Sequence, residues 1–124
     1  MDIESCIPVI PSFDLQNSLL FWRDGLGFEV SDSVVKNGEL IFCMLRKSHL
    51  AFMLNQREGG DEKQNDYESI RLYWSPKNLS EMRTHLSSLG FSPSEIYNRD
   101  YGRTEFFLTD SDGFSHCFGV VTEA

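Results

Sequence analysis

The chain has 124 residues, enough for one compact domain or for two small modules that share a core. With 40% apolar and 13% aromatic residues, it has the composition of a globular protein and is too hydrophobic for a disordered chain. The net charge of −8 and the pI near 4.7 argue against nucleic acid and anionic membranes as partners. This charge is compatible with a cationic ligand, although it also serves solubility.

Cysteine usage and the N-terminal residues indicate the compartment. Cys6, Cys43 and Cys117 are odd in number and form no Cys-x-x-Cys pair, which predicts reduced thiols rather than a disulfide framework or a zinc knuckle. Residues 1–4 are acidic and unlike a secretory signal, and no apolar run reaches the length that crosses a bilayer. The sequence therefore predicts a cytoplasmic protein without membrane segments.

The first half of the chain predicts a strand, a helix and three strands. The apolar run 6–12 contains two prolines, which lack the donor that an inner strand needs, so this strand is expected at a sheet edge. Asp14 is the expected N-cap of a helix. The buried face of that helix is predicted from apolar residues at helical spacing: Leu15, Leu19, Trp22 and Leu26. Further strands are expected over 28–35, 39–45 and 50–54, the first two joined by an Asn-Gly turn.

The second half repeats this order after a polar segment. Residues 56–66 are polar, contain glycine and show no periodicity, which predicts a linker or a flap. Residues 69–74 alternate as a half-buried strand does, and Asn78 is the expected cap of the second helix. The buried face of that helix is predicted from four residues: Leu79, Met82, Leu86 and Leu89. Strands are then expected over 91–98, 104–109 and 114–121.

Both predicted helices end in Leu-Gly-Phe, first at 26–28 and again 63 residues later at 89–91. A glycine just past a helix can adopt the left-handed conformation that ends it, and the next apolar residue then folds back. Because the flanking strands recur in the same order, the chain is predicted to be a tandem βαβββ duplication of the α+β class. Module one is expected at 1–55, the linker at 56–66 and module two at 67–124.

Two βαβββ units resemble the vicinal-oxygen-chelate superfamily, which includes glyoxalase I, extradiol dioxygenases and bleomycin-resistance proteins. The resemblance rests on three stretches: Ile7-Pro8-Val9-Ile10 before Asp14-Leu15, Phe21-Trp22 before the first Leu-Gly-Phe, and 102–106 before Asp110-Ser111-Asp112-Gly113. The bleomycin-resistance branch is most similar, although it has Arg-Glu-Phe where this chain has Thr104-Glu105-Phe106. The resemblance implies curled mixed sheets around a cavity between two units, within one chain or across a homodimer.

The same resemblance implies where a metal would be held. Metal-dependent members place His, Glu or Gln at strand positions that correspond here to Ile7, Ser69 and Cys117. Ile7 has no ligand atom, Ser69 would be a poor ligand, and one thiol does not make a divalent-metal site. His116 and Cys117 are neighbours on a strand and point to opposite faces, so both cannot serve one cavity. The sequence therefore predicts no metal cofactor.

The register of the resemblance also predicts a ligand cavity. Its expected lining is Arg71, Tyr73, Glu105, Phe107, Phe42 and Cys117, with Thr109, Ser115 and Gly119 on the same face. Glu105 could pair with a cationic group of a ligand; alternatively, it pairs with Arg71 or faces solvent. Phe42, Phe52 and Trp74 could stack on a flat ligand or pack in a core. Cys117 is expected to be a buried, inert thiol, because no base to activate it is identifiable.

Together, these residues and the resemblance predict a metal-independent, bleomycin-resistance-like protein without catalytic residues. It would sequester a flat or cationic small molecule, such as a bleomycin-like compound, in a cavity at a homodimer interface. Two alternatives remain. One is a metal-dependent glyoxalase- or dioxygenase-type lyase, isomerase or oxygenase with atypical ligands. The other is a scaffold that binds a cellular metabolite.

Overall fold

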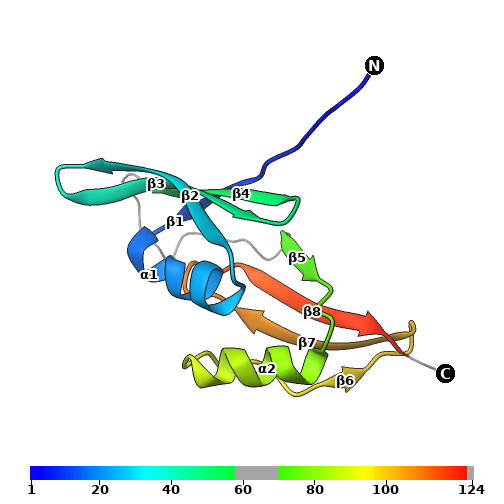
Figure 1. The fold of residues 1–124 in the computed structure, drawn as a ribbon. Helices are drawn as coiled ribbons and strands as arrows, with labels where there is room; N and C mark the ends of the chain where they lie inside the picture. The colour runs from blue at the N-terminus through cyan, green and yellow to red at the C-terminus, as the bar shows by residue number, and fades with distance from the viewer. Residues whose placement is uncertain (58–69, 123–124) are drawn as a thin grey trace. The chain divides into compact units, whose positions relative to one another are not determined.

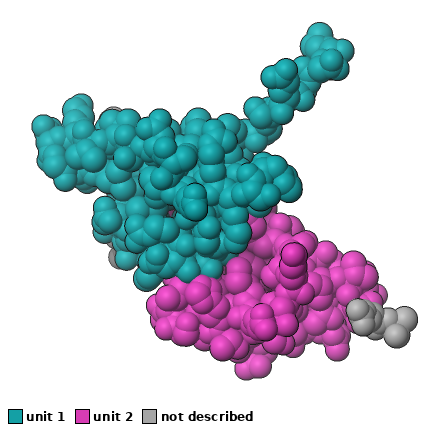
Figure 2. Space-filling view, viewed as in Figure 1, with its two compact units in different colours: residues 1–64 teal, residues 65–124 magenta. Residues whose placement is uncertain are grey.

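The computed structural model describes residues 1–57 and 70–122. The chain divides into two compact units, residues 1–64 and 65–124 (Figure 2). Each unit has a four-stranded mixed sheet and helical segments, which confirms the α+β class (Figure 1). Most of the predicted linker, from residue 58 to residue 66, lies outside the described residues, as does Ser69. None of the helices in the described ranges is long and apolar enough to cross a membrane.

The first unit has the predicted order of elements. They are β1 (Val9–Ser12), α1 (Leu15–Leu19), the π-helical η1 (Leu20–Gly25), β2 (Glu29–Lys36), β3 (Glu39–Lys47) and β4 (Leu50–Gln56). The strands lie in the order β1-β4-β3-β2, with β1 parallel to β4 at the edge, as the two prolines of the run 6–12 predict. Asn37 and Gly38, both with positive φ, make the predicted turn between β2 and β3.

The first helical segment is irregular in a way that its apolar spacing does not predict. Asp14 caps it as expected, since its carboxylate accepts a hydrogen bond from the backbone N–H of Asn17 at 3.2 Å. The second part is a π-helix, whose wider turn places both Phe21 and Trp22 in the core. The ring centroids of Trp22 and Phe52 are 5.1 Å apart, so Phe52 packs in the core of this unit.

The second unit repeats the order with one weaker strand. Its elements are β5 (Arg71–Trp74), α2 (Leu79–Ser88), β6 (Tyr97–Asn98), β7 (Arg103–Thr109) and β8 (Ser115–Val121), in the sheet order β5-β8-β7-β6. The prediction of a strand over 91–98 is wrong except at its last two residues. Pro93 lacks a backbone donor, and the Arg83 guanidinium donates to the carbonyl of Ser94 at 2.7 Å. The backbone N–H of Ser94 still donates to the carbonyl of Phe107 on β7 at 2.8 Å, but the Phe107 N–H bonds to Ser94 Oγ at 2.8 Å, so the ladder is not regular here.

Both helices end as the Leu-Gly-Phe repeat predicts. Gly27 has a φ of +82° and Gly90 a φ of +96°, the left-handed conformation that favours glycine. The backbone N–H of Phe28 donates back to the carbonyl of Trp22 at 3.0 Å, and that of Phe91 donates to the carbonyl of Leu86 at 3.2 Å. The matching helix ends and strand orders confirm the tandem βαβββ architecture.

Candidate functional site

One face of the second unit's sheet carries five of the six residues predicted to bind a ligand. Residues that pair across neighbouring strands project to the same side of a sheet. The central row contains Tyr73, Cys117 and Phe107. The row on one side of it contains Arg71, Ser115 and Thr109. The row on the other side contains Gly119, Glu105 and Tyr97. We call this side the Cys117 face. Phe42 lies in the first unit, on β3, where it pairs with Val34 and Asn55.

The opposite side of the same sheet forms the core of the second unit. Phe106, His116 and Phe118 are fully buried there. His116 pairs with Leu72 and Leu108, whereas Cys117 pairs with Tyr73 and Phe107, so His116 and Cys117 point to opposite sides. The Trp74 ring stacks against Phe118, with centroids 6.5 Å apart. Trp74 therefore belongs to the core side and not to a ligand-stacking surface.

His116 has a structural role in a buried hydrogen-bond chain. The indole N–H of Trp74 donates to Nδ1 of His116 at 2.9 Å, so Nε2 carries the proton and donates to Asp110 Oδ2 at 2.7 Å. Asp110 Oδ1 accepts from the backbone N–H groups of Asp112 and Phe114 at 2.9 and 3.0 Å. The Asp-x-x-Gly turn before β8 is thus held in place by its aspartate. The side chains of Trp74, His116 and Asp110 therefore stabilise the fold.

Glu105 is the only fully buried carboxylate among the described residues, and its partners come from its own chain. Arg103 Nε donates to Oε2 at 2.9 Å, the Tyr101 hydroxyl donates to Oε1, and Arg99 Nε lies 3.7 Å from Oε1. Burial raises the pKa of Glu105, but hydrogen bonds from Tyr101, Arg103 and the Cys117 thiol outweigh burial and lower it overall. The alternative expectation, that Glu105 pairs with Arg71 or faces solvent, is therefore wrong, because Glu105 is buried and pairs with Arg103.

The two arginines that flank Glu105 also lie over aromatic rings. The Arg103 guanidinium carbon is 5.9 Å from the centroid of Tyr73, and that of Arg99 is 5.1 Å from the centroid of Phe107. A methyl group on Gly119 would lie 2.5 Å from Nη2 of Arg103, so the absence of a side chain there makes room for this guanidinium.

Three residues of this cluster, Arg99, Tyr101 and Arg103, were not predicted from the sequence. Arg103 could have been found, because it lies two positions before Glu105 and strand alternation puts both on one face. Arg99 and Tyr101 come from the loop between β6 and β7, where the backbone N–H of Arg99 donates to the carbonyl of Arg103 at 2.7 Å. That loop has no periodicity from which its side-chain directions could be inferred.

Cys117, which the sequence predicts to be a buried and inert thiol, is buried. Its side chain is fully buried, and burial together with the neighbouring Glu105 carboxylate raises the pKa of Cys117 to about 12. The thiolate is the form that attacks electrophiles, so this buried thiol is a poor nucleophile.

The residues at the family's metal positions do not fit a divalent metal. Ile7 offers no ligand atom, and Cys117, which is fully buried, offers a single thiol. Within residues 1–57 and 70–122, no group of three or more His, Cys, Asp and Glu side chains lies close enough to hold a metal ion. Glu105, the carboxylate nearest Cys117, is engaged by arginines that would repel a cation.

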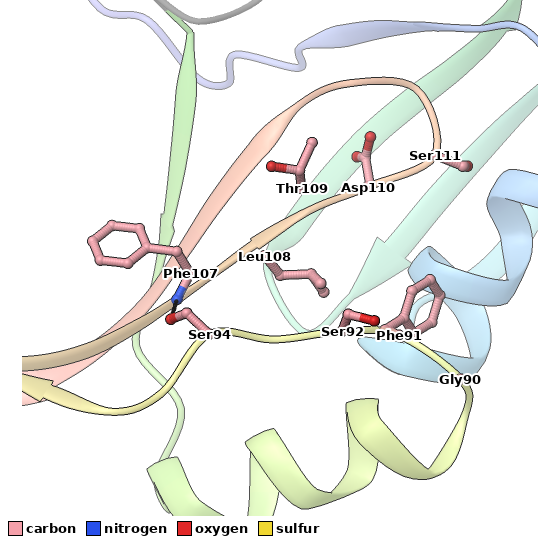
Figure 3. A pocket seen from close by; sticks show the side chains of 9 residues that line it. All are labelled: Gly90, Phe91, Ser92, Ser94, Phe107, Leu108, Thr109, Asp110 and Ser111. Atoms are coloured by element: carbon pink, nitrogen blue, oxygen red, sulfur yellow. Dashed lines mark hydrogen bonds between the residues drawn. The ribbon is translucent and has the colours of Figure 1, made fainter.

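A pocket of about 570 Å³ adjoins the Cys117 face, between β7 and the segment that follows α2 (Figure 3). Its lining is Gly90, Phe91, Ser92, Ser94, Phe107, Leu108, Thr109, Asp110 and Ser111. Ser94 Oγ accepts a hydrogen bond from the backbone N–H of Phe107 at 2.8 Å, which joins the two walls. Its volume suits a small organic ligand. Phe107 and Thr109 connect this pocket to the face.

Comparisons with known proteins agree with this architecture. Residues 7–118 match the model of the family described as Glyoxalase/Bleomycin resistance protein/Dioxygenase superfamily. The structure of SMU.1112c is similar, with 18% identity, a TM-score of 0.74, and coverage of 96% of this chain and 100% of that chain. A glyoxalase-related enzyme from Clostridium phytofermentans has 16% identity, a TM-score of 0.71, and coverage of 98% and 97%. The bleomycin resistance determinant encoded on transposon Tn5 has 18% identity, a TM-score of 0.66, and coverage of 98% and 100%. No curated protein matches the chain.

Proposed function

The chain belongs to the Glyoxalase/Bleomycin resistance protein/Dioxygenase superfamily, and from this membership we propose that it binds a small organic molecule without a metal and without catalysis. The protein would sequester this ligand, which is the role that the resemblance to bleomycin-resistance proteins implies. The observation that supports the proposal is the Cys117 face, where aromatic rings and an arginine-paired carboxylate surround Cys117, the one described residue at a metal position that has a ligand atom.

The chemistry of this face supports binding over catalysis. General acid–base or nucleophilic catalysis needs a group whose pKa lies near the working pH. Burial raises the pKa of Cys117 to about 12, and the hydrogen bonds to Glu105 hold the pKa of that carboxylate below its usual range. The hydrogen bond from the Tyr101 hydroxyl to Glu105 raises the pKa of Tyr101. All three groups are thereby moved away from neutral pH.

Of the two ligand types expected from the sequence, flat and cationic, the contacts of Glu105 favour the flat one. A cationic ligand would need a free carboxylate, and Glu105 is already paired with Arg103. Tyr73, with 58% of its surface exposed, and the half-buried Phe107 offer rings to a planar ligand.

A cytoplasmic homodimer completes the proposal. The resemblance implies that the ligand cavity forms between two units, and these can come from two subunits. In the first unit, Val9 and Val34 are exposed, and Phe42, Met44 and Met53 are half-buried on the same side of the sheet. A second subunit would cover such an apolar face. The free thiols of all three cysteines suit a reducing compartment.

A thermal-shift series with metal-free bleomycin and planar aromatic compounds tests this function, with and without EDTA. A ligand that binds only the folded chain raises the unfolding midpoint by mass action. We expect a rise with at least one compound, unchanged by EDTA and lost in Tyr73→Ala. Leu50→Ala, an exposed substitution on the other side of the first unit's sheet, should keep the rise. A rise that requires a divalent metal would contradict the proposal, and no shift with bleomycin would remove its drug-sequestration form.

A further inference from the structure

The Cys117 face is basic, although the whole chain has a net charge of −8. Arg71 projects from the face, and the guanidiniums of Arg99 and Arg103 lie over its aromatic rings. Glu105 is the buried carboxylate among them, and Asp100, in the same loop, is exposed. Positive charge thus exceeds negative charge at the place where the proposed ligand would bind, opposite to the balance of the chain.

The two guanidiniums stand on either side of Cys117. Tyr73 and Phe107 are the strand partners of Cys117 on its two sides. Arg103 lies over the first ring and Arg99 over the second. Each guanidinium approaches the Glu105 carboxylate through Nε, at 2.9 Å for Arg103 and 3.7 Å for Arg99.

The terminal nitrogens of both arginines remain available for a ligand. An arginine has five N–H donors, and Nε supplies only one. Within the described part of the chain, Arg103 bonds to Glu105 through Nε, and the Nε of Arg99 is buried 3.7 Å from Glu105 without a hydrogen bond, so the polar contacts of both guanidiniums are made by Nε and not by a terminal nitrogen. Their side chains are 36% and 28% exposed, so a ligand can reach them.

The position of Arg103 is fixed by the protein rather than by solvent. Glu105, which is fully buried, holds its Nε, and Tyr73 lies beneath its plane. Gly119 leaves the space that the guanidinium occupies, since a methyl group there would come within 2.5 Å of Nη2. A preorganised guanidinium loses little freedom on binding and presents two parallel donors.

We propose that the ligand of the Cys117 face carries an anionic oxygen group, such as a carboxylate or a sulfonate, attached to a planar apolar group. The anion binds between Arg99 and Arg103, above Cys117, and the planar part lies against Tyr73 and Phe107. Forked hydrogen bonds from guanidinium to an oxyanion are among the strongest in proteins. This inference rests on the proposed binding function and specifies the class of ligand.

Three matched probes of equal size test the charge of the ligand: naphthoate, naphthamide and naphthylmethylamine. Dissociation constants are measured on the full chain by titration at low salt. We expect naphthoate to bind about tenfold more tightly than naphthamide, the size of one charge-assisted hydrogen bond, and the amine to bind most weakly. The preference for naphthoate should shrink as salt is added, because part of the attraction is screened.

Substitutions locate the effect. Arg99→Gln and Gly119→Ala, the second of which displaces Arg103, should each remove most of the preference for naphthoate over naphthamide. The double variant Arg103→Gln/Glu105→Gln removes both charges of the buried pair together and should abolish the preference while the chain stays folded. Arg23→Gln is the matched control, because Arg23 is an exposed arginine on the first unit that pairs with its neighbour Asp24.

The outcomes separate this inference from the function on which it rests. Equal binding of all three probes, or a preference for the amine, would overturn the anionic ligand and leave small-molecule binding intact. A naphthoate preference that survives Arg99→Gln and the double variant would also overturn it. Failure of all three probes to bind would contradict both the inference and the proposed planar ligand.

Discussion

Replacing Asp110 with alanine is expected to lower the free energy of unfolding by about 3 kcal/mol, the cost of leaving several buried donors unpaired. Asp110 accepts hydrogen bonds from the backbone N–H groups of Asp112 and Phe114 and from Nε2 of His116. All of these lie in the buried turn before β8 or in the core, where water cannot replace the lost acceptor. Urea denaturation of the wild type and the variant measures the difference.

Two further variants make this prediction specific. Asp110→Asn keeps one carbonyl oxygen for the backbone and should lose less stability than Asp110→Ala. Asp24→Ala removes an exposed carboxylate and should leave the unfolding midpoint nearly unchanged. If Asp110→Ala were as stable as Asp24→Ala, the turn would not depend on its aspartate.

Glu105→Gln is expected to lower the free energy of unfolding by about 2 kcal/mol at neutral pH, because a buried charged acceptor is replaced by a neutral one. The carboxylate holds Arg103 and the Tyr101 hydroxyl, and its pKa is lowered in the folded chain. The stabilisation is therefore complete above the ordinary glutamate pKa of 4.5 and is lost as the pH falls through the lower folded value.

The pH dependence distinguishes a charge effect from a packing effect. Unfolding free energies at neutral pH and at several points below pH 4.5 should show the gap between wild type and Glu105→Gln closing with acid. Glu29→Gln, an exposed substitution on β2, serves as the control for general acid sensitivity. A gap of constant size across this range would mean that the ionised form of Glu105 contributes nothing to stability.

Local sequence rules predicted the scaffold of the site well. The alternation of strand residues places Tyr73, Phe107 and Cys117 on one face and His116 on the other. The two Leu-Gly-Phe stops predicted where both helices end. These features follow from the periodicities of strands and helices, which can be recognised from the order of apolar and polar residues along the sequence.

Features set by contacts between distant residues could not be read in this way. The π-helix of the first unit forms where Phe21 and Trp22 both pack into one aromatic core. Arg99 and Tyr101 reach Glu105 because the β6–β7 loop folds over the sheet, and Arg83 takes the carbonyl that a longer β6 would have used. Alternation suggests which face a residue occupies but not which partner it meets there.

Family membership explains the fold, whereas the chemistry of the site depends on the particular residues of this chain. A glyoxalase-related enzyme and a bleomycin resistance determinant share the architecture at 16% and 18% identity, which shows the fold and not a function. In this chain, two of the three positions that hold the metal in metal-dependent members carry Ile7, which has no ligand atom, and the buried Cys117, whose neighbouring carboxylate Glu105 is paired with Arg103.

The metal content of the chain, purified without chelators, tests the central claim most directly. Elemental analysis should find iron, manganese, nickel and zinc well below one equivalent per chain, and EDTA should leave the unfolding midpoint unchanged. One equivalent of any of these metals, lost with EDTA together with part of the thermal stability, would contradict the account of a metal-independent binding protein.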